Sequence, residues 1–248
     1  MLHRDMLTQL AFAAVAAAAD LAGAIVVTQA HRKGGAPLRY FVAGGAGFML
    51  AAAFARMLPE SAHMPHAFLF VLIGYFGVHL FEHTVAPHLH FGEEVHVEAF
   101  VRPSAAYLAI LGLGMHTLFD GVAIAAGFMI GTELGLLLFL AVVLHKLPEG
   151  FTVASIVLAT GRSRAAAVLA GAVLGGLTLL GAVVTSALAD AHVGYALALS
   201  AGVTIYVAAS DLIPEVNREG GATLAWTVFG GLLLFGLADW ALGHLGTR

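Results

Sequence analysis

Eight long apolar runs follow one another along this chain, and each is long enough to cross a lipid bilayer as a helix. A bilayer core about 30 Å thick requires about 20 apolar helical residues to span it. Short stretches with charge, proline or glycine separate the runs. They extend approximately over residues 6–30, 38–58, 66–86, 103–130, 133–160, 165–188, 192–213 and 222–242. We therefore predict an all-α integral membrane protein with eight transmembrane helices, forming one domain over residues 1–248 without a soluble appendage.

The composition supports a membrane protein and excludes several functions. Of the 248 residues, 60% are hydrophobic and 10% are charged, whereas soluble proteins carry about 25% charged residues. The net charge of -4 argues against a nucleic-acid partner, since binding to phosphates requires clustered cations. The chain has no cysteine, which excludes disulfides and thiolate metal sites.

Basic residues predict the orientation, because cytoplasmic loops collect lysine and arginine. The connections after spans one, three, five and seven lie on one side of the membrane. They contain most of the lysine and arginine residues that are not inside a span. We expect both termini to face away from the cytoplasm, with the first span retained, in a plasma (inner) membrane of bacterial type. The cations on the cytoplasmic side are Arg32, Lys33, Arg39, Arg102, Arg162, Arg164 and Arg218, against Arg4, Arg56 and Arg248 opposite.

Two pairs of ionisable residues lie inside apolar runs, where charge is expensive and marks functional sites. His116 and Asp120 are four residues apart in span four, and His145 and Glu149 repeat this spacing in span five. The spacing places each pair on one helix face. If the two helices are neighbours, two imidazoles and two carboxylates converge, which is a ligand set suited to zinc and related divalent ions.

Pro148 lies within the second pair and predicts a kink in span five, because proline cannot donate a hydrogen bond to Leu144. Inside lipid, a free carbonyl is tolerated only beside a cavity or a polar partner. The kink therefore indicates a hydrated pathway. The alternative is a buried ion-pair network that holds two helices together, with His116 facing Asp120 and Lys146 facing Glu149.

These segments resemble the ZIP (Zrt/Irt-like) metal transporters, whose fourth and fifth helices carry motifs of the form H-N-x-x-D/E-G and H-x-x-P-E-G. The matching segments here are residues 116–121 and 145–150. Further matches in the same order are residues 47–52, 58–60, 82–83 and 206 with 211–215, so the resemblance covers essentially the whole chain. It implies a bundle of the ZIP type in which spans one, four, five and six move against the other four, in a homodimer.

The resemblance also implies the ligands of the transported ion, namely His116, Asp120, His145 and Glu149. Met49 is an additional ligand by its local sequence, although a methionine on an apolar helix is as well explained by packing.

The chain departs from the two-metal members of the family at the positions that bind a second metal. Thr117 and Lys146 replace an amide and a polar or acidic ligand, and span six has no acidic residue, with Thr178 at the corresponding place. A protonated Lys146 would repel a second cation a few ångströms away. We therefore predict a single-metal site, in which the lysine ammonium stands where the second metal would be.

Other candidate metal sites lie toward the cytoplasmic side. A short loop at about residues 87–102 is dense in histidine and glutamate and can capture metal after its release, or is simply a solvated loop. Two further groups, one in span three and one in span seven, can line the path by which the metal leaves. The group in span seven is equally explained as a pair of residues at a helix end. These residues are His88, His90, Glu93, Glu94, His96 and Glu98 in the loop, His79, Glu82 and His83 in span three, and Asp211 and Glu215 in span seven. Asp20 and Asp239 are single membrane acids that we expect to bond to neighbouring helices.

These observations predict a divalent-metal transporter rather than an enzyme. We expect Zn²⁺ as the substrate, with Cd²⁺, Fe²⁺, Mn²⁺ and Co²⁺ as further candidates, carried toward the cytoplasm by alternating access through helices four and five. Protons compete with metal for His116 and His145. The alternatives are an intramembrane zinc-dependent hydrolase, against which the chain has no H-E-x-x-H pattern, and a cation channel.

Overall fold

The computed structural model describes residues 2–29, 35–85, 103–219 and 221–245, and every regular element within these ranges is a helix. Eight helical segments are long and apolar enough to cross a membrane, which confirms the predicted architecture. The elements are α1 (Leu2–Gln29), α2 (Gly35–Ala52), η1 (Ala53–Met57), α3 (Leu58–Ser61), α4 (Ala67–Thr84), α6 (Pro103–Ile130), α7 (Thr132–Ala159), α8 (Arg164–Ser186), α9 (Asp190–Tyr206), η2 (Val207–Leu212), α10 (Ile213–Glu219) and α11 (Ala222–Leu245).

Two of the spans are composite helices with a π-helical turn inside them. The second span runs through α2, η1 and α3, and the seventh through α9, η2 and α10. The prediction for the seventh span ended too early, since the span continues to Arg218 instead of stopping near residue 213. Its last turns are polar because Asp211 and Glu215 face an internal cavity rather than lipid.

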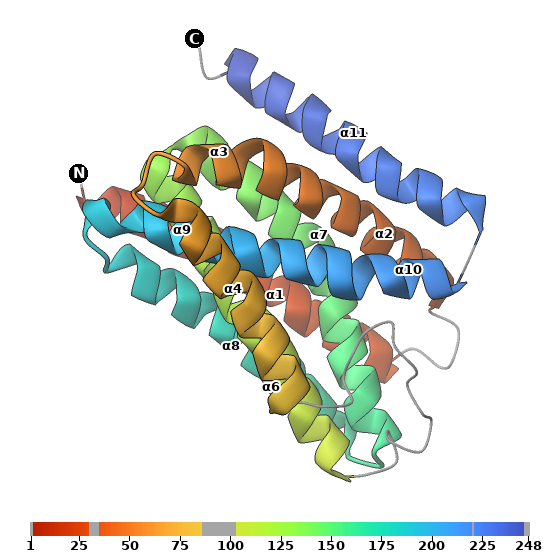
Figure 1. The fold of residues 1–248 in the computed structure, drawn as a ribbon. Helices are drawn as coiled ribbons and strands as arrows, with labels where there is room; N and C mark the ends of the chain where they lie inside the picture. Colours follow the sequence, from red (N-terminus) through yellow and green to blue (C-terminus); the bar gives the residue numbers. More distant parts are fainter. Residues whose placement is uncertain (1, 30–34, 86–102, 220, 246–248) are drawn as a thin grey trace.

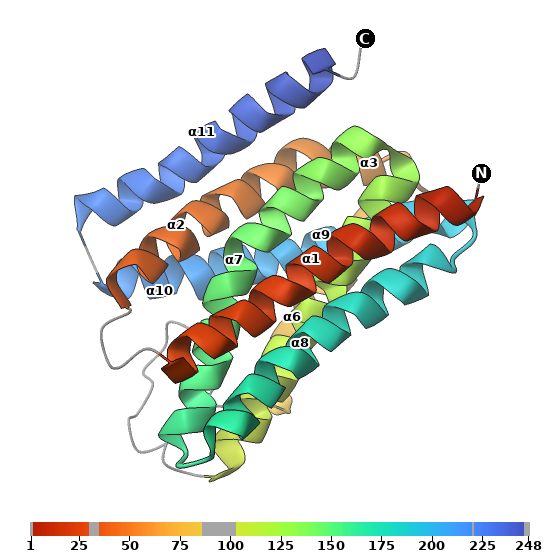
Figure 2. The ribbon, with the colours of Figure 1, turned by 180° about the vertical axis from the view of Figure 1, so that it is seen from behind.

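The helices form two groups of four that pack against each other (Figures 1 and 2). One group contains α1, α6, α7 and α8, and in the other α2 packs against α11 while α4 packs against α9. The main contacts between the groups are α6 with α9 and α2 with α7. α11 lies at the edge of the molecule. Large apolar side chains such as Leu7, Leu169, Trp226 and Leu237 are exposed, as expected for surfaces that face lipid.

Each histidine motif ends in a glycine, and these two glycines let other helices approach the site. A Cβ atom on Gly121 would lie 1.9 Å from the carbonyl oxygen of Thr178 on α8. A Cβ atom on Gly150 would lie 1.9 Å from the carbonyl oxygen of Asp20 on α1. Only a residue without a side chain fits between such closely packed backbones. The two glycines therefore bring α8 and α1 against the helices that carry the motifs.

α7 carries Pro148 inside an otherwise continuous helix, and its axis bends near the middle (Figure 2). Pro148 also lines the internal cavity, which agrees with the expectation that a proline inside a span lies beside a hydrated space.

Replacement of Gly150 by alanine should loosen the packing of α1 on α7. The added methyl group overlaps the backbone of Asp20 and forces the two helices apart, at a cost of about 1–3 kcal/mol, which is typical of overpacking. Gly176→Ala on α8 is the matched control, because its Cβ atom would meet nothing within 4 Å. Thermal unfolding of the purified variants in detergent measures the difference. Equal melting temperatures for both variants would contradict this account of Gly150.

Candidate metal centre

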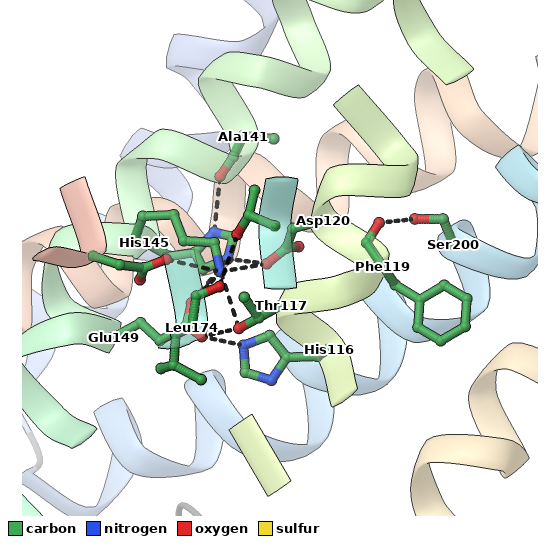
Figure 3. A network of polar contacts seen from close by, with 12 residues as sticks. His116, Thr117, Phe119, Asp120, Ala141, His145, Glu149, Leu174 and Ser200 are labelled. Atoms are coloured by element: carbon green, nitrogen blue, oxygen red, sulfur yellow. Dashed lines mark hydrogen bonds and ion pairs between the residues drawn. The ribbon is translucent and has the colours of Figure 1, made fainter. Parts of the chain in front are cut away.

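The structure brings together the four residues that the two motifs predicted. One nitrogen or oxygen atom from each of His116, Asp120, His145 and Glu149 lies within 4.8 Å of all the others, and all four residues are buried. His116 and Asp120 come from α6, and His145 and Glu149 from α7. Figure 3 shows the four side chains pointing toward one another between these helices.

Two histidine–carboxylate pairs in this centre run between the helices. Nε2 of His116 lies 3.3 Å from Oε1 of Glu149, and Nε2 of His145 lies 3.2 Å from Oδ2 of Asp120. The alternative pairing of His116 with Asp120 is therefore not the one observed. Each motif supplies a histidine that faces the carboxylate of the other motif, so the polar contacts bind α6 to α7.

His145 is held in the orientation that a metal ligand needs. Its Nδ1 atom lies 3.0 Å from the backbone carbonyl of Ala141, so a proton on Nδ1 is donated there. The other ring nitrogen, Nε2, then faces Asp120 and Glu149, whose Oε2 atom is 4.0 Å away. A backbone partner of this kind fixes the tautomer of metal-binding histidines.

Lys146 and Thr117 lie beside the carboxylates of this centre. The Lys146 ammonium lies 2.6 Å from Oε2 of Glu149, 2.9 Å from Oδ2 of Asp120 and 3.1 Å from Oγ1 of Thr117. The Thr117 hydroxyl also donates to Glu149. The Lys146 side chain is completely buried. The hydroxyl of Thr178 instead donates to its own helix at the carbonyl of Leu174, 3.5 Å away.

The sequence did not indicate that Asp20 belongs to this network. Asp20 lies on α1 with its Oδ2 atom 3.7 Å from the Lys146 ammonium. We had expected a bond to a neighbouring helix, but among the described residues Asp20 has only this ion pair with Lys146 of α7, and neither of its oxygens accepts a hydrogen bond. Asp239 also pairs with another span, since its Oδ1 atom lies 2.5 Å from the guanidinium of Arg56.

The centre opens on one side into a cavity of about 290 Å³. His116, His145 and Glu149 line its inner part, while Asp211 and Glu215 also contribute to its wall. On the other side, Asp120 and Met49 border a void of only about 10 Å³. The two spaces beside the site thus differ greatly in size. The cavity residues are Arg39, Val42, Leu113, His116, His145, Pro148, Glu149, Phe151, Thr152, Ser155, Ile156, Val207, Asp211, Leu212, Glu215 and Val216.

The other predicted metal sites are placed differently. Glu82 is buried, whereas His79 and His83 on the same helix are exposed and stack with their ring centroids 4.0 Å apart. None of the three is among the residues lining the cavity. Glu215 lies 3.6 Å from Arg218 and pairs with it, which is a different pair from the one between Asp211 and Glu215 that the spacing suggested. The loop residues His88, His90, Glu93, Glu94, His96 and Glu98 lie outside the described residues.

Two imidazole nitrogens and two carboxylate oxygens form a ligand set that zinc accepts in tetrahedral geometry. The same polar contacts also suit a structural network of ion pairs, so geometry alone leaves both interpretations open. The fold and this centre define the class of protein as an eight-helix membrane protein with a buried cluster of two histidines and two carboxylates between two helices.

Comparison with known proteins identifies the family of this chain. The family model described as ZIP zinc transporter matches residues 88–238, which include both motifs, and the chain therefore belongs to this family. Zinc transporter ZIP9 of Xenopus tropicalis is 33% identical over 168 residues, covering 62% of this chain and 55% of that protein. Zinc transporter ZIP6 of Homo sapiens is 34% identical over 114 residues, covering 45% of this chain and 15% of that protein. The chain thus matches about half the length of ZIP9 and less of ZIP6.

Removal of one histidine ligand should abolish tight zinc binding. His145→Ala removes a nitrogen ligand and should weaken zinc affinity by about 100-fold or more, since even outer contacts to a metal site contribute about 10–100-fold. His192→Ala is the matched control, because His192 is exposed at the start of α9. Competition with a chelating dye measures both affinities. A purely structural network would instead lower thermal stability in His145→Ala and leave zinc affinity equal in the two variants.

Proposed function

We propose that this protein carries Zn²⁺ across the membrane, one ion at a time, through the centre between α6 and α7. The observation that supports this most strongly is the convergence of four buried ligand atoms within 4.8 Å of one another at the inner end of a cavity. Membership of the ZIP zinc transporter family supports zinc as the substrate. Binding sites in secondary transporters commonly lie where two sets of helices meet.

The unequal access to the centre supports alternating access. The large cavity is bordered by Arg39 and Glu215, which belong to the ends of α2 and α10 beside the segments rich in basic residues. The positive-inside rule assigns that end to the cytoplasm. This conformation is then the inward-facing one, and both termini lie outside. The outward-facing state requires α1, α6, α7 and α8 to shift against the other helices and enlarge the void beside Met49.

Charge at the centre supports transport of a single ion. The Lys146 ammonium contacts both carboxylates that would bridge two metals, and one positive charge repels another strongly at short range inside a protein. Met49 is 2% exposed and borders the same void as Asp120, so its thioether can join the ligands when the outer side opens.

The intramembrane hydrolase is the less favoured function. Such an enzyme would require a cleft that admits its substrate from the lipid and an open position on the metal. The wall of the cavity instead contains the charged residues Arg39, Asp211 and Glu215. These charged groups, set among apolar side chains, favour the entry of water and ions, as in a half-channel.

Zinc uptake into proteoliposomes tests the proposal. The wild-type protein should take up zinc in a saturable manner, and Glu149→Ala should reduce uptake to the level of empty vesicles, because it removes a metal ligand. Asp239→Asn is the control, since it removes a span carboxylate that pairs with Arg56 away from the centre. Uptake by Glu149→Ala at the wild-type rate, or zinc binding without any uptake by the wild type under an imposed gradient, would contradict the proposal.

A further inference from the structure

A third carboxylate beside the metal centre has no role in the ligand set. Asp20 on α1 is fully buried, and neither of its carboxylate oxygens accepts a hydrogen bond from any of the residues that the structure describes. Its nearest cation is the Lys146 ammonium, 3.7 Å from Oδ2, which is beyond hydrogen-bonding distance. A buried carboxylate without hydrogen bonds is costly and needs an explanation.

The contacts of the Lys146 ammonium are directed elsewhere. It donates hydrogen bonds to Glu149 and Thr117, and it forms an ion pair with Oδ2 of Asp120, 2.9 Å away. Asp20 therefore stands next to a cation whose hydrogen bonds go to residues of the metal centre.

Lys146 and a metal ion in the centre need the same oxygen atoms. Oδ2 of Asp120 faces Nε2 of His145 at 3.2 Å and the Lys146 ammonium at 2.9 Å. Oε2 of Glu149 likewise lies near both, at 4.0 Å and 2.6 Å respectively. A divalent ion bound by the four ligands would lie close to the ammonium and repel it, which favours a shift of the ammonium away from at least one carboxylate. A shift of about 1 Å toward Asp20 would bring the ammonium to the 2.7–2.9 Å of a charge-assisted hydrogen bond.

The net charge of the site also indicates a role for Asp20. The three carboxylates and one ammonium carry a net charge of minus two, which one divalent ion neutralises when both histidines are neutral. Without Asp20, the loaded centre would keep one uncompensated positive charge in a buried setting, where isolated charge is strongly unfavourable. The charges of Asp120 and Glu149 alone are thus too few to neutralise a divalent ion, because the charge of Lys146 cancels one of them.

We propose that Asp20 is a positioning residue that accepts the Lys146 ammonium when a divalent metal ion occupies the centre. This inference rests on the proposed single-metal site and adds the residue that makes room for the ion. Gly150 is what allows the role, because it lets the backbone of α1 at Asp20 pack directly on α7. Occupancy of the centre then strengthens the contact between α1 and α7, two helices of the same group.

A double-mutant cycle on Asp20 and Lys146 tests this role, with zinc affinity of the purified protein as the readout. Asp20→Asn removes the negative charge that attracts the ammonium, so Lys146 stays on the ligand carboxylates and zinc affinity falls by roughly 10–100-fold, as for other outer contacts of a metal site. Lys146→Gln removes the competing cation and binds zinc at least as tightly as the wild type. In the double variant Asp20→Asn/Lys146→Gln, affinity returns to the wild-type value or above. Asp239→Asn is the matched control and keeps wild-type affinity.

An equal loss of affinity from Asp20→Asn in the presence and absence of Lys146 would overturn the proposal, since it would make Asp20 a direct ligand or a purely structural residue. If Asp20→Asn does not fold, Lys146→Gln alone decides, because weaker zinc binding than in the wild type would also overturn the proposal. Glu149→Ala separates this inference from the proposed function. Retained zinc binding in Glu149→Ala refutes the metal centre, whereas loss of binding there with unchanged binding in Asp20→Asn refutes only the role of Asp20.

Discussion

The ammonium of Lys146 is the charge on which the arrangement of this site depends. A fully buried cation inside a membrane span is tolerated only when carboxylates surround it. Here the carboxylates come from α1, α6 and α7, so the lysine fixes how these helices meet. The same cation fills the space beside the metal ligands and places a positive charge there. One residue therefore holds the helices together and limits the centre to a single divalent ion in our proposal.

The glycines that close the two motifs explain why such a crowded site can form. Gly121 admits the backbone of α8 and Gly150 admits that of α1, so α1, α6, α7 and α8 pack as one group around the ligands. The second group contacts the first chiefly along α6 and α7. A metal bound between α6 and α7 consequently lies within the group that moves in the proposed transport cycle, and the cavity provides its path to the cytoplasm.

Much of this architecture could be predicted from the sequence, because a helix that crosses lipid must be about 20 residues long and apolar, so that each charge inside it stands out. The eight spans and the two pairs with a spacing of four residues follow from that rule, as does the cavity beside Pro148. The pairing of His116 with Glu149 could not be predicted, since it depends on the rotation of α6 relative to α7. Asp20 was also missed as part of the centre. It is more than a hundred residues away from Lys146 in the sequence, and only the close approach at Gly150 brings them together.

X-ray absorption spectroscopy of the zinc-loaded, purified protein tests the central claim most directly, because it reports the ligands and any neighbouring metal without relying on transport. A single zinc ion held by His116, Asp120, His145 and Glu149 predicts nitrogen and oxygen ligands at about 2.0–2.2 Å with the outer scattering of imidazole. It also predicts no scattering from a second metal. A zinc–zinc distance of about 3.5–4 Å, as in two-metal sites, would contradict the account.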